Sequence, residues 1–473
     1  MSSVPSFAEV QNVKVGGDIT VRGFWRRNLD LRHAESTATP GRQDDLFLMS
    51  TTGVNVGADL TENVGAFIRL ANERDWNQDE AGTSTANTAA GDFDLSQAYI
   101  TLKELFYSPL TVRVGQQPIV WGRGFILGSN LLPSILNTGG GTSTAAGDDR
   151  NAAISANEYT DFTAFDAIRA TLDLGGVASI GVPLMVDYVY IKQDEGLFNE
   201  ADDINVQGLN FSTHFDSMNS EVEAYYLNKR DRSRTITQNR GSVSTIGLRG
   251  SAKPVEGAYL YSEMALQFGK KGTLLDAGIT TNPTGSGQQA WAFDLGGEFT
   301  FADVATSPKV GLEWIFYSGH DKDGAFQGWD PIAPSYFTTL IRSYQTRNTG
   351  VTGLYPTDQA GVTSAFTNQH EFALYGGLKP IDDLGVDSRL SWFWLEDGSI
   401  PTTTPAGSAS RNSYLGTEWD TMLTYDYTDD VQFGLAYGVF FPGNVFRDAG
   451  DGSDATSGAD TAQQLISKVS VKF

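Results

Sequence analysis

Charged side chains alternate with apolar or small ones along many segments of this chain, and their signs differ along its length. Basic residues occupy such positions mainly in the early segments, with two later additions: Arg22, Arg26, Arg69, Lys103, Arg113, Arg169, Arg249 and Arg389. Acidic residues occupy them in the later segments: Glu223, Glu263, Glu298, Glu313, Glu418 and Asp420. Arginine binds carboxylates through paired hydrogen bonds. Two facing rows of opposite sign would create a transverse field that orients and selects solutes.

The same charged residues have a structural interpretation. Neighbouring arginine and glutamate side chains brace adjacent strands, so each residue is a candidate for solute contact or for bracing. The side to which Asp187 points is left open, because Leu184, Val186 and Tyr188 do not define an apolar row clearly.

Two acidic runs, "HDKDGAF" and "DAGDGSD", carry aspartates at short spacing beside glycine, as calcium loops do. The candidate Ca²⁺ ligands are Asp321 and Asp323 in the first run, and Asp448, Asp451 and Asp454 in the second. Neither run has the closing glutamate of a complete calcium loop. Bound Ca²⁺ in outer loops is therefore the one cofactor that the sequence suggests.

Residues for catalysis do not form a recognisable set. The four histidines lie on separate segments without metal-ligand spacing, and neither a nucleophile elbow nor a phosphate-binding loop occurs. We therefore expect a protein that is not an enzyme.

The composition narrows the class of protein. The chain has 473 residues, a formal net charge of -24, 52 glycines and no cysteine. No apolar run approaches the ~20 residues of a membrane-spanning helix, and no basic stripe suggests nucleic acid as a partner. The opening "MSSVPSFAEVQNVKVGGD" lacks the features of a signal peptide. We expect Met1 to stand in place of a removed export signal; a cytoplasmic protein without one is the alternative.

The elements that must position the charged residues are β-strands. In "VQFGLAYGVFF" one face is an unbroken apolar row and the other is small or polar, which is the period of a strand. Such segments follow one another with connections that are alternately short and long. They comprise an opening strand, eight hairpins and a closing strand, about 18 in all, and this even number and alternation are typical of bacterial outer-membrane barrels.

The predicted fold is all-β: a single transmembrane antiparallel β-barrel with short periplasmic turns and long extracellular loops. Residues 1–16 are expected to form a periplasmic segment and residues 17–473 the barrel. A soluble all-β protein is the alternative, but it has no reason to keep its long loops at one end. The apolar rows would face lipid and the charged rows a hydrated lumen. Loops 122–165 and 319–368 are candidates to fold inward and narrow it, and extracellular disorder is the alternative.

The chain ends on "LISKVSVKF", a strand-like run in which Phe473 shares a face with Val469 and Val471. We expect Phe473 to lie at the seam of the barrel and to face lipid. A terminal phenylalanine of this kind resembles the C-terminal signal that the barrel assembly machinery recognises. Five tryptophans are candidates for aromatic girdles at the membrane interfaces, with ordinary packing at the bases of loops as the alternative for each: Trp25, Trp76, Trp121, Trp394 and Trp419.

Several stretches resemble the alginate-export family of outer-membrane barrels. They are "GDITVRGFWRRNLDL", "LSQAYITLKELFYSPLTVRVGQQPIVWGRGFILGS", "YSEMALQFG", "YSGHDKDGAFQGWDPIAPS", "LGTEWD" and "FFPG". One departure is Gly115-Gln116-Gln117, where the family often has Gly-Arg-Gln. Another is the strong negative charge, which is unexpected in a conduit for a polyanion.

The resemblance implies a bacterial outer-membrane channel that passes polar or anionic solutes, saccharides among them, by passive diffusion. A general small-solute porin is one alternative. A structural or receptor barrel, whose acidic outer loops bind cations or a partner, is another. The expected partners are outer-membrane lipid and lipopolysaccharide, the barrel assembly machinery and the solute.

Overall fold

The fold was analysed in a computed structural model. It describes residues 12–29, 31, 44–76, 93–107, 109–129, 156, 159–175, 182–194, 203–232, 241–270, 287–319, 327–336, 338–342, 366–396, 413–445 and 460–473. Within these ranges lie 18 strands. They are β1 (Asn12–Arg27), β2 (Asp44–Thr61), β3 (Val64–Asp75), β4 (Asp94–Leu102), β5 (Leu110–Gln117), β6 (Phe165–Asp173), β7 (Leu184–Asp194), β8 (Ile204–Phe215), β9 (Ser220–Asp231), β10 (Gly241–Ala252), β11 (Ala258–Lys270), β12 (Gly287–Thr300), β13 (Lys309–Tyr317), β14 (Gln369–Ile381), β15 (Leu384–Trp394), β16 (Tyr414–Asp426), β17 (Val431–Pro442) and β18 (Ala462–Lys472). Two short 3₁₀ turns, η2 (Leu105–Tyr107) and η5 (Ser217–Asn219), lie in hairpin connections.

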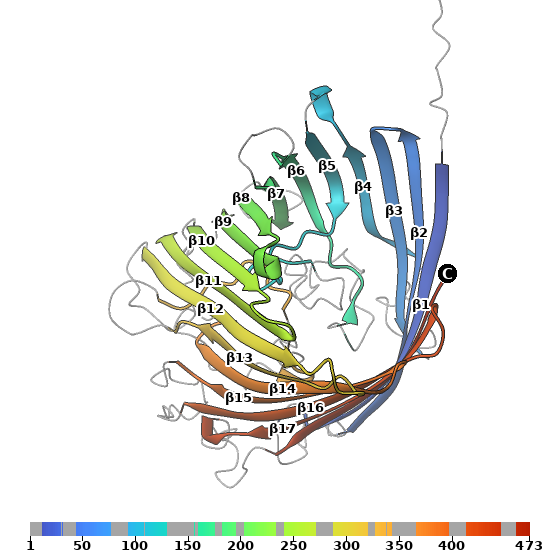
Figure 1. Cartoon of the computed structure of the whole chain (residues 1–473), viewed down its shortest axis with the longest axis vertical. Helices are drawn as coiled ribbons and strands as arrows, with labels where there is room; N and C mark the ends of the chain where they lie inside the picture. The colour runs from blue at the N-terminus through green and yellow to red at the C-terminus, as the bar shows by residue number, and fades with distance from the viewer. Residues whose placement is uncertain are drawn as a thin grey trace, which may run out of the picture.

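The strands form one closed antiparallel sheet (Figure 1). Each strand pairs with its neighbours in the chain, and β1 pairs with β18 from Asp18–Lys472 to Arg27–Gln463. The seam ends where the Phe473 amide donates to the Gly17 carbonyl at 3.0 Å and the Gly17 amide donates to the Phe473 carbonyl at 2.9 Å. Closure removes the edges that an open sheet would expose. The predicted barrel with 18 strands is therefore confirmed.

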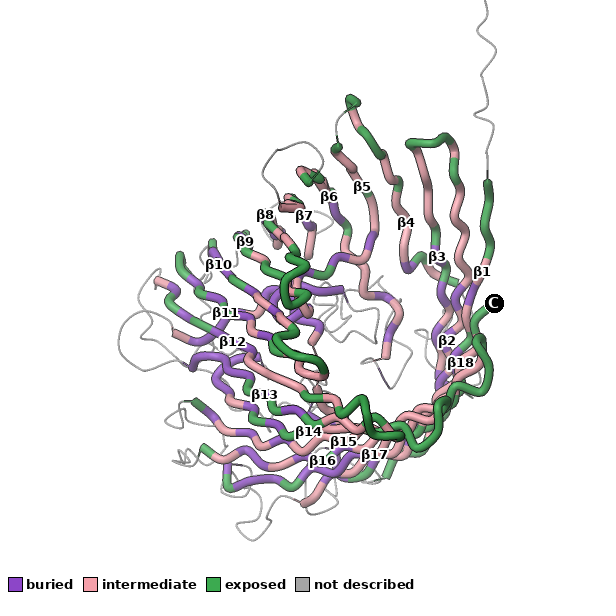
Figure 2. The backbone as a smooth tube through the Cα atoms, viewed as in Figure 1, coloured by how far each residue is buried: buried purple, intermediate pink, exposed green. Residues whose placement is uncertain are grey.

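The two faces of the sheet differ in chemistry, as the strand period predicts. Outward-pointing side chains are large and apolar, and Leu266 and Leu312 are 62% and 50% exposed. Inward-pointing ones are often charged, and Asp294 and Glu418 are 0% exposed. Burial therefore alternates along the strands (Figure 2). Apolar surface outside and polar groups inside are the pattern of a barrel that stands in lipid.

Short and long connections lie at opposite ends of the barrel. Two-residue turns such as 62–63 and 382–383 join hairpins at one end, whereas the long connections 118–164 and 318–368 leave the other. By the rule for such barrels, the short turns are periplasmic and the long loops extracellular.

β1 begins at Asn12, inside the segment of residues 1–16 that we expected to precede the barrel. Among the described residues, no helix has the length and apolar character to cross a membrane.

Parts of the two longest connections fold back into the barrel, as expected of loops 122–165 and 319–368. We call residues 119–129 the first inward segment, and residues 327–336 and 338–342 the second inward segment. The apolar side chains of residues 119–129 and 327–336 pack on the inner wall in one cluster that includes Ile119, Phe125, Trp329, Val189 and Leu227, whereas Ile341 packs in a second cluster. The remainder of both loops lies largely outside the described residues.

Residues 159–164, from the far end of the first long connection, also enter the lumen. The Tyr159 ring lies 5.4 Å from that of Phe24 on β1, and Ser96 on β4 donates to the Asp161 carbonyl at 3.0 Å. The barrel interior is therefore partly filled from two sides.

Aromatic residues occupy both faces of the wall. Phe473 points outward at the seam and is 68% exposed, as predicted. Trp419 and Trp76 are also exposed. Trp121 differs from the prediction, because it lies buried in the first inward segment and its indole Nε1 donates to Asp187 at 3.0 Å. It is part of the lumen filling and not of a girdle.

Candidate functional site

The candidate site is the lumen, and its narrowing element is a unit made by the two inward segments. Leu127 and Ala333 form a parallel bridge. The Ala333 amide donates to the Ile126 carbonyl at 3.3 Å, and the Ser335 amide donates to the Gly124 carbonyl at 2.8 Å. Because the segments satisfy each other's backbone groups, they act as one inserted element.

Arg123 joins this element to the acidic wall, which we define as the inner faces of β9–β16, where the predicted acidic residues lie. Its Nη1 donates to Asp294 Oδ2 on β12 at 3.1 Å, and its Nη2 lies 3.3 Å from Glu313 Oε1 on β13 and donates to the Tyr336 hydroxyl. The guanidinium also lies over the Tyr261 ring, 3.6 Å from its centroid. Burial raises the pKa of the Tyr336 phenol well above its usual value, so the phenol stays protonated and donates to Glu313 at 2.7 Å.

Three of the predicted acidic residues accept hydrogens from the backbone of the inward segments. Glu223 accepts from Gly122 at 3.2 Å, Glu418 accepts from Ile341 and Arg342 at 2.6 and 2.9 Å, and Asp420 accepts from Leu340 at 3.4 Å. Hydrogen bonds to charged acceptors are among the stronger ones. The acidic wall thus holds the inserted element. Part of the hydrogen-bonding capacity of these carboxylates is used in doing so.

Four of the predicted basic residues are braced by ion pairs. Arg69 pairs with Asp18 and Asp161 at 2.7 and 2.8 Å, Arg169 with Asp187 at 2.9 Å, Arg249 with Glu221 and Glu223 at 3.1 and 2.6 Å, and Arg389 with Glu313 and Glu371 at 2.6 and 2.7 Å. Arg249 and Arg389 lie on β10 and β15, among the acidic residues, and do not continue the basic row of the early strands. The pairing also shows that Asp187 points into the lumen.

The other predicted basic residues differ in their surroundings. Arg22 and Arg26 point inward from β1, and Arg26 Nε donates to Gln464 at 2.8 Å. Arg113 lies on β5 with its guanidinium 4.6 Å from the centroid of the Tyr99 ring. Lys103 lies beyond the end of β4, exposed in the turn to η2, so it does not stand on the strand wall as expected.

The other predicted acidic residues also point inward. Glu263 is 1% exposed and accepts from the Tyr225 hydroxyl at 2.7 Å. Glu298 lies on β12 near the short-turn end. Glu313 contacts Arg123 and Arg389, as described above. The calcium candidates Asp321, Asp323, Asp448, Asp451 and Asp454 all lie outside the described residues. Within the ranges that the structure describes, no group of three or more acidic or histidine side chains is arranged to hold a metal ion.

Several lumen residues were not singled out by the sequence. Arg123 and Tyr336 lie on loops, where the alternation of side chains along a strand cannot predict which way a residue points. They are 213 positions apart, and no sequence pattern connects them. Glu371, Asp294 and Lys468 do lie on alternating strands, so their inward position was open to the same reasoning as that of Glu313. Lys468 is paired in register with Arg22 across the seam and donates to Gln432 at 2.9 Å.

We compared the chain with known proteins. The family model described as alginate export matches residues 11–460. A search of curated protein sequences gave no match. Among solved structures, OccK2 (OpdF) of Pseudomonas aeruginosa is 11% identical, with coverage of 97% of this chain and 98% of that one and a TM-score of 0.50. OpdK of Pseudomonas aeruginosa is 11% identical, with coverage of 97% and 99% and a TM-score of 0.47.

OmpT of Vibrio cholerae is 9% identical, with coverage of 98% and 100% and a TM-score of 0.41. At 11% identity, the OccK2 structure supports the fold alone. The family match covers nearly the whole chain and agrees with the closed barrel and its polar lumen. The chain is an outer-membrane barrel of the channel-forming kind, and it belongs to the alginate export family.

Proposed function

We propose that this barrel is a passive channel for polar and anionic solutes, carboxylated saccharides among them, which pass along the basic side of its lumen. We define the basic wall as the inner faces of β18 and β1–β6, with Lys468, Arg22, Arg113 and Arg169. The family supports a saccharide as the solute. The structure adds a physical reason for the route within the lumen.

The observation that carries the proposal is the unequal pairing of the two walls. On the acidic wall, carboxylates are occupied by Arg123 and by the backbone of the inward segments. On the basic wall, neither Arg113 nor Lys468 has an ion pair with any residue in the described ranges. Their charge is available to a solute in the water-filled part of the lumen, and a series of weak cationic contacts suits conduction better than one tight site.

Planar-bilayer recordings test the proposal. In a KCl gradient we expect the wild-type channel to prefer anions, and the double variant Arg113→Gln, Lys468→Gln to lose most of that preference because two lumen cations without an ion pair in the described ranges are removed. A polyuronate oligomer should block the wild-type current at lower concentration than a neutral dextran of similar size.

The matched control is Arg27→Gln, which removes one charge from the outward side of β1, where Arg27 is 52% exposed. It should leave the reversal potential unchanged. A reversal potential that does not move in the double variant would contradict the basic route. Steady current without polymer block would indicate a general porin, and absence of current a structural or receptor barrel.

A further inference from the structure

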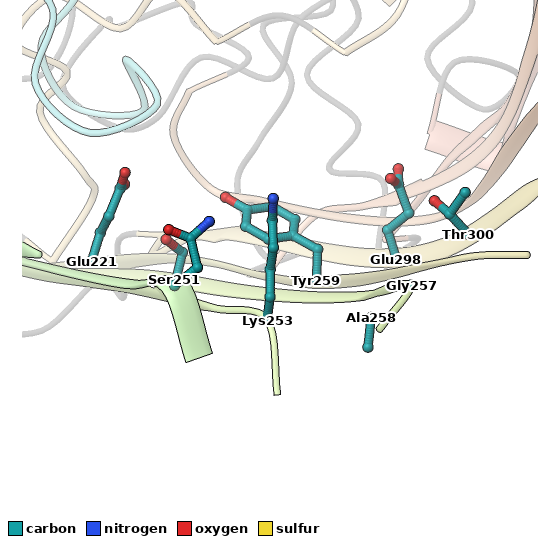
Figure 3. A pocket seen from close by; sticks show the side chains of 9 residues that line it. Glu221, Ser251, Lys253, Gly257, Ala258, Tyr259, Glu298 and Thr300 are labelled. Atoms are coloured by element: carbon teal, nitrogen blue, oxygen red, sulfur yellow. The ribbon is translucent and has the colours of Figure 1, made fainter. Parts of the chain in front are cut away.

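A pocket of ≈ 530 Å³ lies at the short-turn end of the wall formed by β9–β12. Glu221, Lys253, Tyr259 and Glu298 extend from the sheet to the same side, whereas Ala258 points to the other (Figure 3). Tyr259 shares the parity of Tyr261 and Glu263, which face the lumen. The pocket is therefore a feature of the periplasmic mouth, and its volume is typical of a small-molecule site.

Aromatic residues lie on both sides of the Glu298 carboxylate, Tyr259 in the lining of the pocket and Tyr375 beyond it. Tyr259, Glu298, Gly311 and Tyr375 are successive partners across β11 to β14. The Tyr375 ring covers Gly311, where a Cβ would overlap it. Glu298 is thus flanked by two phenol rings, and flat rings beside hydrogen-bonding groups suit a ligand with both apolar and hydroxylated faces.

The polar groups of the pocket are available to a ligand. The side chains of Lys253 and Glu298 have no hydrogen bond or ion pair with any residue in the described ranges. Ser251 and Thr300 add hydroxyl groups to the lining. The carboxylate accepts hydrogens and the ammonium donates them, so hydroxyl groups, which do both, can bind to the two together.

The charge of the lining limits the ligand further. Glu221 and Glu298 face one ammonium group, and Glu221 is shared with Arg249 at 3.1 Å. The lining therefore carries two carboxylates and one ammonium group, so a ligand with its own carboxylate would add a further negative charge beside Glu298. The site lies on the opposite side of the barrel from β1, since β10 stands farthest from β1 in the closed strand order.

We propose that this pocket is a binding site for an uncharged saccharide at the periplasmic mouth. A sugar ring stacks on Tyr259, and its hydroxyl groups donate to Glu298 and accept from Lys253. The site is independent of the anionic route along the basic wall, so either proposal can fail without the other.

Saturation-transfer NMR on the full-length barrel in detergent micelles tests the site, with maltotriose and glucuronate as probes. We expect maltotriose to bind and glucuronate to bind more weakly. Tyr259→Ala should raise the dissociation constant for maltotriose about fivefold or more, because the stacking surface is lost. Glu298→Gln should raise it roughly fivefold, because a neutral amide makes weaker hydrogen bonds than a carboxylate.

Two controls separate binding from folding. Tyr259→Phe keeps the ring and should stay within about twofold of the wild type. Glu256→Gln removes the same charge as Glu298→Gln from the neighbouring turn, outside the lining, and should change nothing. Tighter binding of glucuronate than of maltotriose, no binding of maltotriose, or unchanged binding in Tyr259→Ala would each overturn the proposal.

Discussion

Arg123 connects the inserted element to the wall through several contacts. It contacts two carboxylates and two phenol rings contributed by β11, β12, β13 and the second inward segment. A half-buried guanidinium of this kind is stable because its partners offset the loss of hydration, and removal of it leaves Asp294 buried without its cation, whereas Glu313 keeps Arg389.

We expect Arg123→Ala to loosen the first inward segment and to raise single-channel conductance with more frequent current fluctuations. Asp294 and Glu313 then lose their shared cation and repel each other, whereas the strand ladders around them are unchanged. Bilayer recording measures both effects. Arg27→Ala removes an arginine from the outer surface and should leave conductance at the wild-type value; the prediction is wrong if both variants conduct alike.

At the scale of elements, the second inward segment is held by β16. The Glu418 carboxylate is 0% exposed and accepts from two successive amides of the segment, Ile341 and Arg342. Since these amides have an acceptor on the wall, the segment can remain at its place without belonging to the sheet.

We expect Glu418→Ala to speed hydrogen exchange at the amides of Ile341 and Arg342 by about tenfold or more, because a buried hydrogen bond to a charged group contributes roughly 1.5–3 kcal/mol. Exchange in β16 itself should change little. Asp426→Asn, at the exposed end of the same strand, is the matched control. Equal protection of the two amides in wild type and Glu418→Ala would contradict the anchor.

At the scale of the whole molecule, the barrel separates two solvents. Leu435 on β17 and Met422 on β16 have similar exposed fractions, 42% and 44%. Leu435 belongs to the outward row, and Met422 follows Asp420 and Glu418 in the inward row of its strand. Similar exposed fractions therefore mean contact with lipid for Leu435 and contact with lumen water for Met422.

This difference predicts opposite outcomes for the same substitution. Leu435→Arg should destabilise the barrel in lipid vesicles by about 2–4 kcal/mol near the midplane, because a guanidinium is transferred into hydrocarbon. Met422→Arg should be tolerated within about 1 kcal/mol, because its charge meets water. Urea unfolding in vesicles measures both. Similar losses of stability in the two variants would show that the faces have been assigned wrongly.

The sequence by itself determined the wall of the barrel. Strand period and the alternation of short and long connections depend on neighbours in the chain, so they predict 18 strands, the seam at Phe473 and the inward side of residues such as Arg69 and Glu313. Asp187 was left open because its segment is apolar on both sides, and its pairing with Arg169 decided it.

Only the tertiary structure decided what lies inside the wall. Arg123, Tyr336 and Trp121 are on irregular segments, where no period relates a residue to a face. Closure of the sheet brings the first and second inward segments to the same interior, where Arg123 meets partners far away in the sequence. The distinction between cations that brace the wall through ion pairs, such as Arg249, and cations without an ion pair among the described residues, such as Arg113, depends on those same long-range contacts.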